Sequence, residues 1–254
     1  MVPPSPLASS PNLKHWLRLS EEKKFIFFTG RVELGQGNTT ALLMMIADEL
    51  DSSPSSIILE TARTDLTPNE GITAGSMSIT IGGQALRWVA SALKLQILEI
   101  ASKRLNVNSK DLSICEGYIF DRGKKTEFSL TDFFDELDLS RKIIDDAKPK
   151  IFKERRKSFR DVNRVDLESR LFGAPFIHDL KFDDMIYGAP VHPPGPYSHL
   201  VDLNLEKLKG RPGIIKVVKN GSFVGIIAST SYHAQNAASW ARNNGQWESN
   251  NKEP

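Results

Sequence analysis

The order of hydrophobic and polar residues in the first half of the chain predicts a mixed α+β unit. Residues 16–19 and 25–29 are rich in apolar and β-branched residues and flank the polar turn SEEKK, so they predict two strands. The segment SSIILE, residues 55–60, predicts a third strand. Apolar residues at helical spacing predict helices from Asn38–Thr40 to about Glu49 and from Gln84 to Arg104.

Each of these two helices is expected to bury one apolar face. The face of the first is Ala41, Leu42, Met45, Ile46 and Glu49, and that of the second is Leu86, Val89, Ala90, Leu93, Ile97 and Ile100. Asn38–Thr40 are expected to supply the capping side chains of the first helix.

The remaining part of the first half is less regular. The stretch 61–83 is a long loop rich in Thr, Gly and Ser. Residues 111–130 predict a hairpin with its turn at 121–124, and residues 131–144 predict a helix.

A second unit is expected after Gly173. GAPFIHDL and MIYGAPVHPP predict strands, and VDLNLEKLKGRPG predicts a helix with Asp202 as N-cap and Gly210 as stop. Asn220–Gly221 predicts a tight hairpin, and SYHAQNAASWARNNG predicts a closing helix. The order β-β-α-β-β-α describes an α+β domain of about 80 residues, which is large enough to fold alone.

These patterns predict four regions. Residues 1–14, rich in Pro and Ser, are expected to be flexible; 15–147 form the first domain, 148–171 a charged linker and 172–254 the second domain. The charged residues of the stretch 148–171 could instead bind nucleic acid. No aromatic platform or recognition helix accompanies them, so a solvated linker is favoured.

Composition narrows the class of protein. Of the 254 residues, 40% are hydrophobic and 25% charged, as in ordinary globular proteins, and the net charge of +2 is too small to argue for nucleic acid. The single cysteine, Cys115, excludes an internal disulfide; it lies in a predicted strand and is expected to be buried. No apolar run approaches the ~18 residues of a membrane span. No signal peptide is visible, so we expect a soluble protein, cytoplasmic or periplasmic.

The stretch TGRVELGQGNTTALL places two glycines directly before a helix. Helix N-termini favour anions, so this loop is a candidate ligand site. No lysine follows the glycines, which excludes a P-loop. The dinucleotide fingerprint fails at its third glycine, where Thr40 stands, although Glu60 lies about where a ribose-binding acid is expected. A tight turn without a ligand is the alternative.

A resemblance adds a function. FTGRVELGQGNTTALLMMIADEL, followed by TARTDLTPNEGITAGSMSI, is similar to the start of the molybdenum-cofactor subunit of the xanthine dehydrogenase/aldehyde oxidase family, in the branch of isoquinoline 1-oxidoreductase and nicotinate dehydrogenase. GAPFIHDLKFDDMIYGAPVHPP through GRPGIIKVVKNGSFVGIIA resembles that family's a/b hammerhead domain. The resemblance covers about residues 12–247 and implies a partial molybdenum-cofactor-binding domain followed by a hammerhead.

Members of this family hydroxylate an N-heterocycle or an aldehyde with oxygen from water, using a molybdopterin-type cofactor. The resemblance implies that the Gln36 amide lies beside the molybdenum and bonds a metal oxygen, while Gly35 and Gly37 give the cofactor room. The loop 67–78 is a second expected wall, with Thr73, Gly75 and Ser76 as the residues that face the ligand; a well-capped surface turn is the alternative. The chain itself is expected to supply no metal ligand.

The sequence also departs from the family. The later cofactor segments and the base glutamate follow the hammerhead in family members, and neither has a counterpart before Pro254. Glu33, Glu49, Glu60 and Glu70 do not occupy the catalytic motif. His192 stands where the family favours arginine. SRLFGAP stands where the family's hammerhead usually begins with lysine, valine, threonine and glycine. The five histidines lack metal-ligand spacing: His15, His178, His192, His199 and His233.

Two hypotheses follow. The first is a fragment or split subunit of a molybdenum hydroxylase that binds cofactor only when completed by the missing C-terminal part or chain, with a [2Fe-2S] subunit and in some cases a cytochrome as partners. The second is a non-catalytic interaction domain that binds no cofactor.

Overall fold

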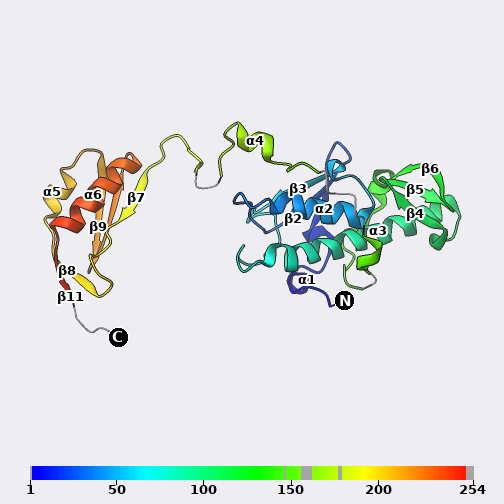
Figure 1. Ribbon diagram of the computed structural model, residues 1–254, viewed down its shortest axis with the longest axis horizontal. Coiled ribbons are helices and arrows are strands. Elements are labelled where there is room, and N and C mark those ends of the chain that lie inside the picture. The colour runs from blue at the N-terminus through cyan, green and yellow to red at the C-terminus, as the bar shows by residue number, and fades with distance from the viewer. Residues whose placement is uncertain (1, 146, 156–161, 177–178, 250–254) are drawn as a thin grey trace. The chain divides into compact units, whose positions relative to one another are not determined.

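The computed structural model describes residues 2–145, 147–155, 162–176 and 179–249. They form two compact units, Met1–Ala174 and Pro175–Pro254, each with a hydrophobic core of its own (Figure 1).

Unit 1 is built on a three-stranded sheet. Strand β1 (Leu17–Leu19) pairs antiparallel with β2 (Phe25–Thr29), and β2 pairs parallel with β3 (Ile57–Thr61). Helix α2 (Asn38–Leu50) connects the two parallel strands, followed by a 3₁₀ turn, η2 (Pro54–Ser56). The three predicted strands and the first predicted helix are therefore confirmed. Because β2 and β3 run in parallel, the loops that follow Thr29 and Thr61 start at the same edge of the sheet.

Helix α3 (Gln84–Leu105) lies beside α2 and is preceded by a π-helix, η3 (Ser78–Gly83) (Figure 1). The expected face of α3 is confirmed in five positions, since Leu86, Val89, Ala90, Leu93 and Ile97 are buried, while its last residue, Ile100, is half-buried against the core. Leu42, Ile46 and Glu49 of α2 are buried as well, whereas Ala41 and Met45 are half-buried. Leu43, Ala47 and Asp48, which lie outside the predicted face, are buried too, so helix α2 is covered on more than one face.

A second sheet packs near the end of α3. It contains β4 (Leu112–Cys115), β5 (Tyr118–Asp121) and β6 (Lys124–Ser129), all antiparallel, after the turn η4 (Ser109–Asp111). The predicted hairpin turn is confirmed. The predicted burial of Cys115 is wrong: Leu112 and Ile114 face the core, so strand alternation turns Cys115 to solvent.

The expected helix at 131–144 is also wrong. A 3₁₀ helix, η5, spans only Leu130–Glu136. Beyond it the Asp138 carboxylate accepts hydrogen bonds from the backbone and hydroxyl of Ser140, at 2.9 and 2.5 Å. Such local side-chain bonds compete with helix formation, which explains why the helix ends early.

Both ends of unit 1 are packed more firmly than the sequence predicted. The N-terminal segment contains α1 (Pro6–Ser9) and η1 (Leu13–His15), and it buries Leu7 and Leu13 in the core, which does not fit a flexible residue range 1–14. The expected linker 148–171 is likewise attached, since the Lys150 backbone amide donates to Glu49 at 2.8 Å. It includes η6 (Phe152–Glu154) and α4 (Leu167–Leu171).

Unit 2 has two small sheets covered by helices. The first has the order β7 (Tyr187–Pro190), β10 (Phe223–Ala228), β9 (Ile214–Asn220), and the second pairs β8 (Ser198–Asp202) with β11 (Gln246–Ser249). The helices are α5 (Leu205–Lys209) and α6 (Ser231–Asn244). The predicted β9–β10 hairpin, the closing helix and the stop at Gly210 are confirmed.

Other expectations for unit 2 are corrected. GAPFIHDL forms no strand in its described residues, because Phe176 and Asp179 close a local turn instead. The N-cap of α5 is Asn204, which accepts from Lys207 N at 3.0 Å, and Asp202 ends β8. Strands β8 and β11 lack a clear signal in the sequence, so the observed order is β7-β8-α5-β9-β10-α6-β11. The assignment of this unit as a hammerhead stays a prediction.

Candidate functional site

The glycine loop between β2 and α2 has a backbone that requires glycine. Gly35 has φ 104° and Gly37 has φ 76°, both in the left-handed region that other residues avoid. Gly37 is the N-cap of α2 and so has no side chain with which to cap the helix. The first backbone amides of α2 therefore need an acceptor from elsewhere.

Glu33 supplies that acceptor. Its carboxylate accepts hydrogen bonds from the backbone amides of Gly35 at 2.8 Å, Gly37 at 2.9 Å and Thr39 at 3.1 Å. Partial burial raises the pKa of Glu33, but these three bonds outweigh it and hold the pKa below its ordinary value. The expectation that Asn38–Thr40 supply the capping side chains is wrong, because Glu33 caps the helix instead. An anion site at this helix start stays a prediction.

Gln36 projects from the tip of this loop and is exposed. Its amide oxygen accepts from Leu34 N at 2.6 Å, and its amide nitrogen donates to the Val32 carbonyl at 2.9 Å. The carboxamide is thus held by its own loop, with one lone pair of its oxygen and one N–H of its nitrogen left over. Gln36 presents a neutral, pre-oriented polar group.

The second predicted wall lies against the base of the glycine loop. The Thr73 hydroxyl accepts from Val32 N at 2.9 Å, and Arg31 donates to the Ile72 carbonyl at 2.8 Å. The structure therefore brings Thr73 together with the loop that carries Gly35, Gln36 and Gly37. The other two predicted residues, Gly75 and Ser76, lie in an exposed turn closed from Met77 N to the Ala74 carbonyl.

A buried ion pair holds the two loops from below. Glu70 accepts from the Thr29 hydroxyl at 2.5 Å and from Gly30 N at 2.6 Å, and its other oxygen lies 3.6 Å from Arg31 Nε. Burial raises the pKa of Glu70, while these partners lower it in part. Gly82 of η3 must lack a side chain here, since a Cβ would lie 2.9 Å from Glu70 and 3.0 Å from Arg31.

Arg164 braces the glycine loop from the segment that precedes α4. Its guanidinium donates to the Gly35 carbonyl at 2.8 Å and lies 3.6 Å from the Glu33 carboxylate. Asp166 holds the same guanidinium at 2.6 and 2.9 Å. Val165 N also donates to the Thr40 hydroxyl at 3.0 Å.

A depression of about 450 Å³ opens at the carboxyl ends of β2 and β3. Ligands of open α/β sheets typically bind outside this edge. Its lining includes Gly30, Val32, Thr64, Thr67, Asn69 and Glu70.

The other carboxylates have structural roles or lie apart. Glu49 is buried and accepts from Arg87 at 2.8 and 3.1 Å and from Lys150 N; burial raises its pKa, and these partners offset the rise in part. Glu60 is half-buried on β3.

In the part of the chain that the structure describes, no group of His, Cys, Asp or Glu could hold a metal ion. Among the same residues, no helix combines the length and apolarity needed to cross a membrane.

Sequence reasoning missed the residues that build this site. Glu33, Arg31, Glu70 and Arg164 fix the loops, yet from sequence the two glutamates are considered only to be rejected as the catalytic base, and the arginines are not singled out. One signal in the sequence could have found Glu33. A helix whose N-cap is glycine has no capping side chain of its own and needs an acceptor from another residue, and Glu33 is the acidic residue nearest to Gly37 in sequence.

Comparison with known proteins identifies the family. The molybdopterin cofactor-binding domain family matches residues 4–150, more than half of the chain, and the chain belongs to it. More particularly, the chain is related to the molybdenum-binding subunits of the xanthine dehydrogenase/aldehyde oxidase family.

Two relatives and one solved structure illustrate the match. A subunit of nicotinate dehydrogenase from Pseudomonas putida is 26% identical over 92% of this chain and 20% of its own length. A protein of Gluconacetobacter polyoxogenes named membrane-bound aldehyde dehydrogenase [pyrroloquinoline-quinone] is 24% identical over 77% of this chain and 26% of its own length. Reconstituted CO dehydrogenase from Oligotropha carboxidovorans is 27% identical over 46% of this chain and 15% of its own, with a TM-score of 0.41. The chain thus spans about a fifth to a quarter of the two relatives.

The residues present fit one part of a molybdopterin cofactor better than another. The amides of Gly37 and Thr39 at the start of α2 donate to Glu33, so these two are not available to the cofactor's phosphate. The exposed, neutral carboxamide of Gln36 fits a contact near the metal, where an added charge would be costly. The loop therefore fits the metal end of the group.

Proposed function

We propose that this chain contributes the first wall of the metal pocket in a molybdenum hydroxylase that oxidises an N-heterocycle or an aldehyde with oxygen from water. The single observation that carries the proposal is the joined pair of loops: Val32 bonded to Thr73, with Gln36 exposed at the tip. The match of residues 4–150 to the cofactor-binding family supports it.

Exposed apolar side chains next to this site support the need for further segments. Leu34 is 58% exposed and Ile72 is 74% exposed, and they lie on the two loops that the Val32–Thr73 bond joins. Single exposed apolar side chains are common on protein surfaces, but a group of them beside a pocket is typical of an interaction site. We infer that the segments which relatives have beyond the matched length cover these residues and complete the cofactor site.

Within that site, each residue of this chain has a defined task. When bound, the molybdenum cofactor supplies the redox chemistry and the activated oxygen of the reaction. Gln36 would offer its carboxamide to the metal end of the group, and the bonds to Val32 and Leu34 fix the plane of that carboxamide. Glu33 and Arg164 keep the loop closed, and the Glu70–Arg31 pair sets the spacing of the two walls.

Electrons released by the oxidation must leave through a partner. In line with the relatives whose names describe subunits of complexes, we propose a [2Fe-2S] subunit, and in some assemblies a cytochrome, as the acceptor.

A non-catalytic interaction domain is the second candidate. The observation in its favour is that the loop's strongest donors are satisfied internally, by Glu33 and by Gln36 itself. Such a domain folds and docks with a partner but binds no cofactor.

An isotope experiment separates the two. The assembly that contains this chain is isolated from its own host and incubated with nicotinate or an aromatic aldehyde, an artificial electron acceptor and H₂¹⁸O. A hydroxylase incorporates ¹⁸O into the product and reduces the acceptor in step. Failure with both substrate classes, in an assembly shown to contain molybdenum, contradicts the hydroxylase proposal.

A further inference from the structure

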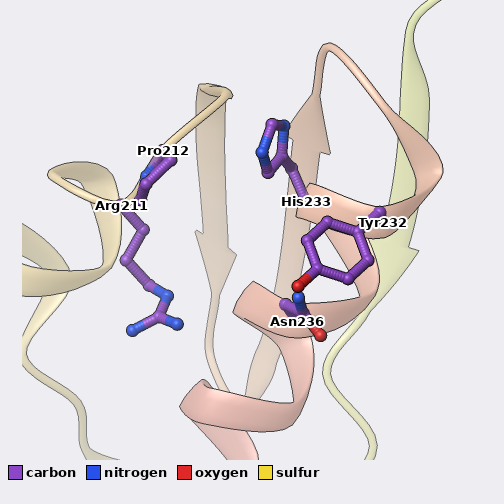
Figure 2. Close-up of a pocket in the computed structure, with 5 residues that line it drawn as sticks. All are labelled: Arg211, Pro212, Tyr232, His233 and Asn236. Carbon is purple, nitrogen blue, oxygen red and sulfur yellow. The ribbon is translucent and has the colours of Figure 1, made fainter.

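A hollow of about 220 Å³ lies in unit 2, between the turn that precedes β9 and the first turns of α6 (Figure 2). It is separate from the site in unit 1. Its lining consists of Arg211, Pro212, Tyr232, His233 and Asn236.

Most of the side chains around this hollow are polar. The Arg211 guanidinium lies over the ring of Trp240, 5.4 Å from its centroid, and among the described residues it forms no ion pair. Tyr232 and Asn236 are exposed, so their hydroxyl and carboxamide are open to a ligand from solvent. Figure 2 shows Arg211 on one side of the hollow and Tyr232 and Asn236 on the other.

His233 closes the upper part of the hollow in a fixed position. Its Nδ1 is buried without a hydrogen-bond partner among the described residues, and a Cβ at Gly213 would lie 2.0 Å from that atom. The imidazole therefore packs directly on the backbone of Gly213, whose φ is +72°. The backbone amide of His233 donates to the Thr230 hydroxyl at 3.1 Å, and this bond anchors His233 in the first turn of α6.

The chemistry of these groups selects a class of ligand. A guanidinium offers five N–H donors in a planar fork that matches a carboxylate or a phosphate, and a hydroxyl and a carboxamide add further donors. An arginine without a carboxylate partner among the described residues, facing a hydroxyl and a carboxamide across a hollow, favours an anion. The volume is below the roughly 300–1,000 Å³ of sites for drug-sized ligands, so the ligand must be small.

We propose that this hollow binds a small oxyanion, a carboxylate or a phosphate, with Arg211 as its charged partner. Asn236 and Tyr232 donate to the remaining oxygens, and His233 forms a rigid wall. The proposal does not depend on the function of unit 1.

Titrations of the full ¹⁵N-labelled chain with inorganic phosphate and with malonate test it, followed by NMR, with uncharged malonamide as the control compound. Saturable shifts of the Asn236 side-chain amide and of residues 230–236 are expected with at least one of the two anions and not with malonamide. Whichever anion binds more tightly identifies the chemical type of the ligand.

Variants make the test specific. Arg211→Gln should weaken binding by about ten-fold or more, because a charge-assisted bond is lost. Arg242→Gln removes the same charge from an exposed position of α6 and should leave the affinity within about two-fold. Asn236→Leu serves as a second variant if Arg211→Gln unfolds. No saturable shift with either anion, or equal weakening by Arg211→Gln and Arg242→Gln, overturns the proposal.

Discussion

The Glu33 carboxylate accepts a hydrogen bond from the backbone amide of Thr39 at 3.1 Å and so caps helix α2, which begins five residues after Glu33. The glycine loop therefore contains its own anion. This relationship limits what the loop can bind: the amides of Gly35, Gly37 and Thr39 are occupied by Glu33, while one lone pair and one N–H of the Gln36 carboxamide remain available.

Removing this cap should destabilise unit 1. Glu33→Ala is expected to lower the free energy of unfolding by about 1–2 kcal/mol, the usual range for loss of a capping side chain. Exposed Glu21, replaced in the same way, should change it by less than about 0.5 kcal/mol. Urea unfolding followed by circular dichroism measures both. Equal values for the two variants would mean that Glu33 does not cap α2.

The cap should also give the wild type a defined acid sensitivity. The folded-state pKa of Glu33 lies below its ordinary value of 4.5, so its stabilising contribution is complete above that pH and is lost as pH falls through the folded pKa. Glu33→Gln lacks this contribution. The stability difference between wild type and Glu33→Gln should therefore shrink below pH 4.5. A difference that grows in acid would contradict the sign of the shift.

The pair Arg31–Glu70 should behave as a buried ion pair. Glu70→Leu leaves the buried guanidinium of Arg31 uncompensated and is expected to cost about 3–5 kcal/mol. The double variant Arg31→Met/Glu70→Leu should recover a large part of that loss, since no charge is then left alone. Chemical unfolding of Glu70→Leu, Arg31→Met and the double variant checks this. A double variant whose cost equals the sum of the single changes would show that the two side chains do not interact.

Unit 2 should fold without unit 1. Its core residues, such as Leu208, Val224, Ile226 and Ala241, form a cluster of their own. The segment 175–254 expressed alone is expected to unfold cooperatively and to give a dispersed NMR spectrum. A collapsed spectrum without cooperative unfolding would show that the unit depends on the rest of the chain.

Gln36→Ala tests the metal-end role in the assembled, loaded enzyme. Loss of a hydrogen bond to a strongly polarised group costs ~1.5–3 kcal/mol, so kcat should fall by roughly ten- to a hundred-fold while metal content is largely kept. In the isolated chain the same change removes only the bonds to Val32 and Leu34 at an exposed position, so the stability loss should stay below about 1 kcal/mol. Unchanged turnover at full metal loading would contradict a contact between Gln36 and the metal end, and the loop of Gly35 and Gly37 would then be only a tight turn.

The sequence predicts those elements of the fold whose signals are local. The apolar spacing of α3 and the Asn220–Gly221 turn each specify one conformation, and both are confirmed. The early end of the 3₁₀ helix η5 was missed because local Asp138–Ser140 bonds outweigh the helical pattern, and strand β8 was missed because a distant segment decides it. Strand β8, for example, exists through its pairing with Trp247 and Glu248 of β11.

The candidate site was predictable only in its glycines and its threonine. The positive φ angles of Gly35 and Gly37 follow from the residue type, and the resemblance pointed to Gln36 and Thr73. The residues that hold them act across long sequence separations: Glu70 reaches Thr29, and Arg164 reaches Gly35. No periodicity or spacing carries such information.

The central claim is that this chain belongs to a working molybdopterin site. The most direct measurement is the molybdenum and pterin content of the assembly that is captured from the native host through a tag on this chain, with the chain purified alone as the control. The account predicts both components in proportion to the chain in the assembly and neither in the isolated chain. An assembly that contains the chain but neither molybdenum nor pterin, from cells whose other molybdenum enzymes are loaded, would contradict it.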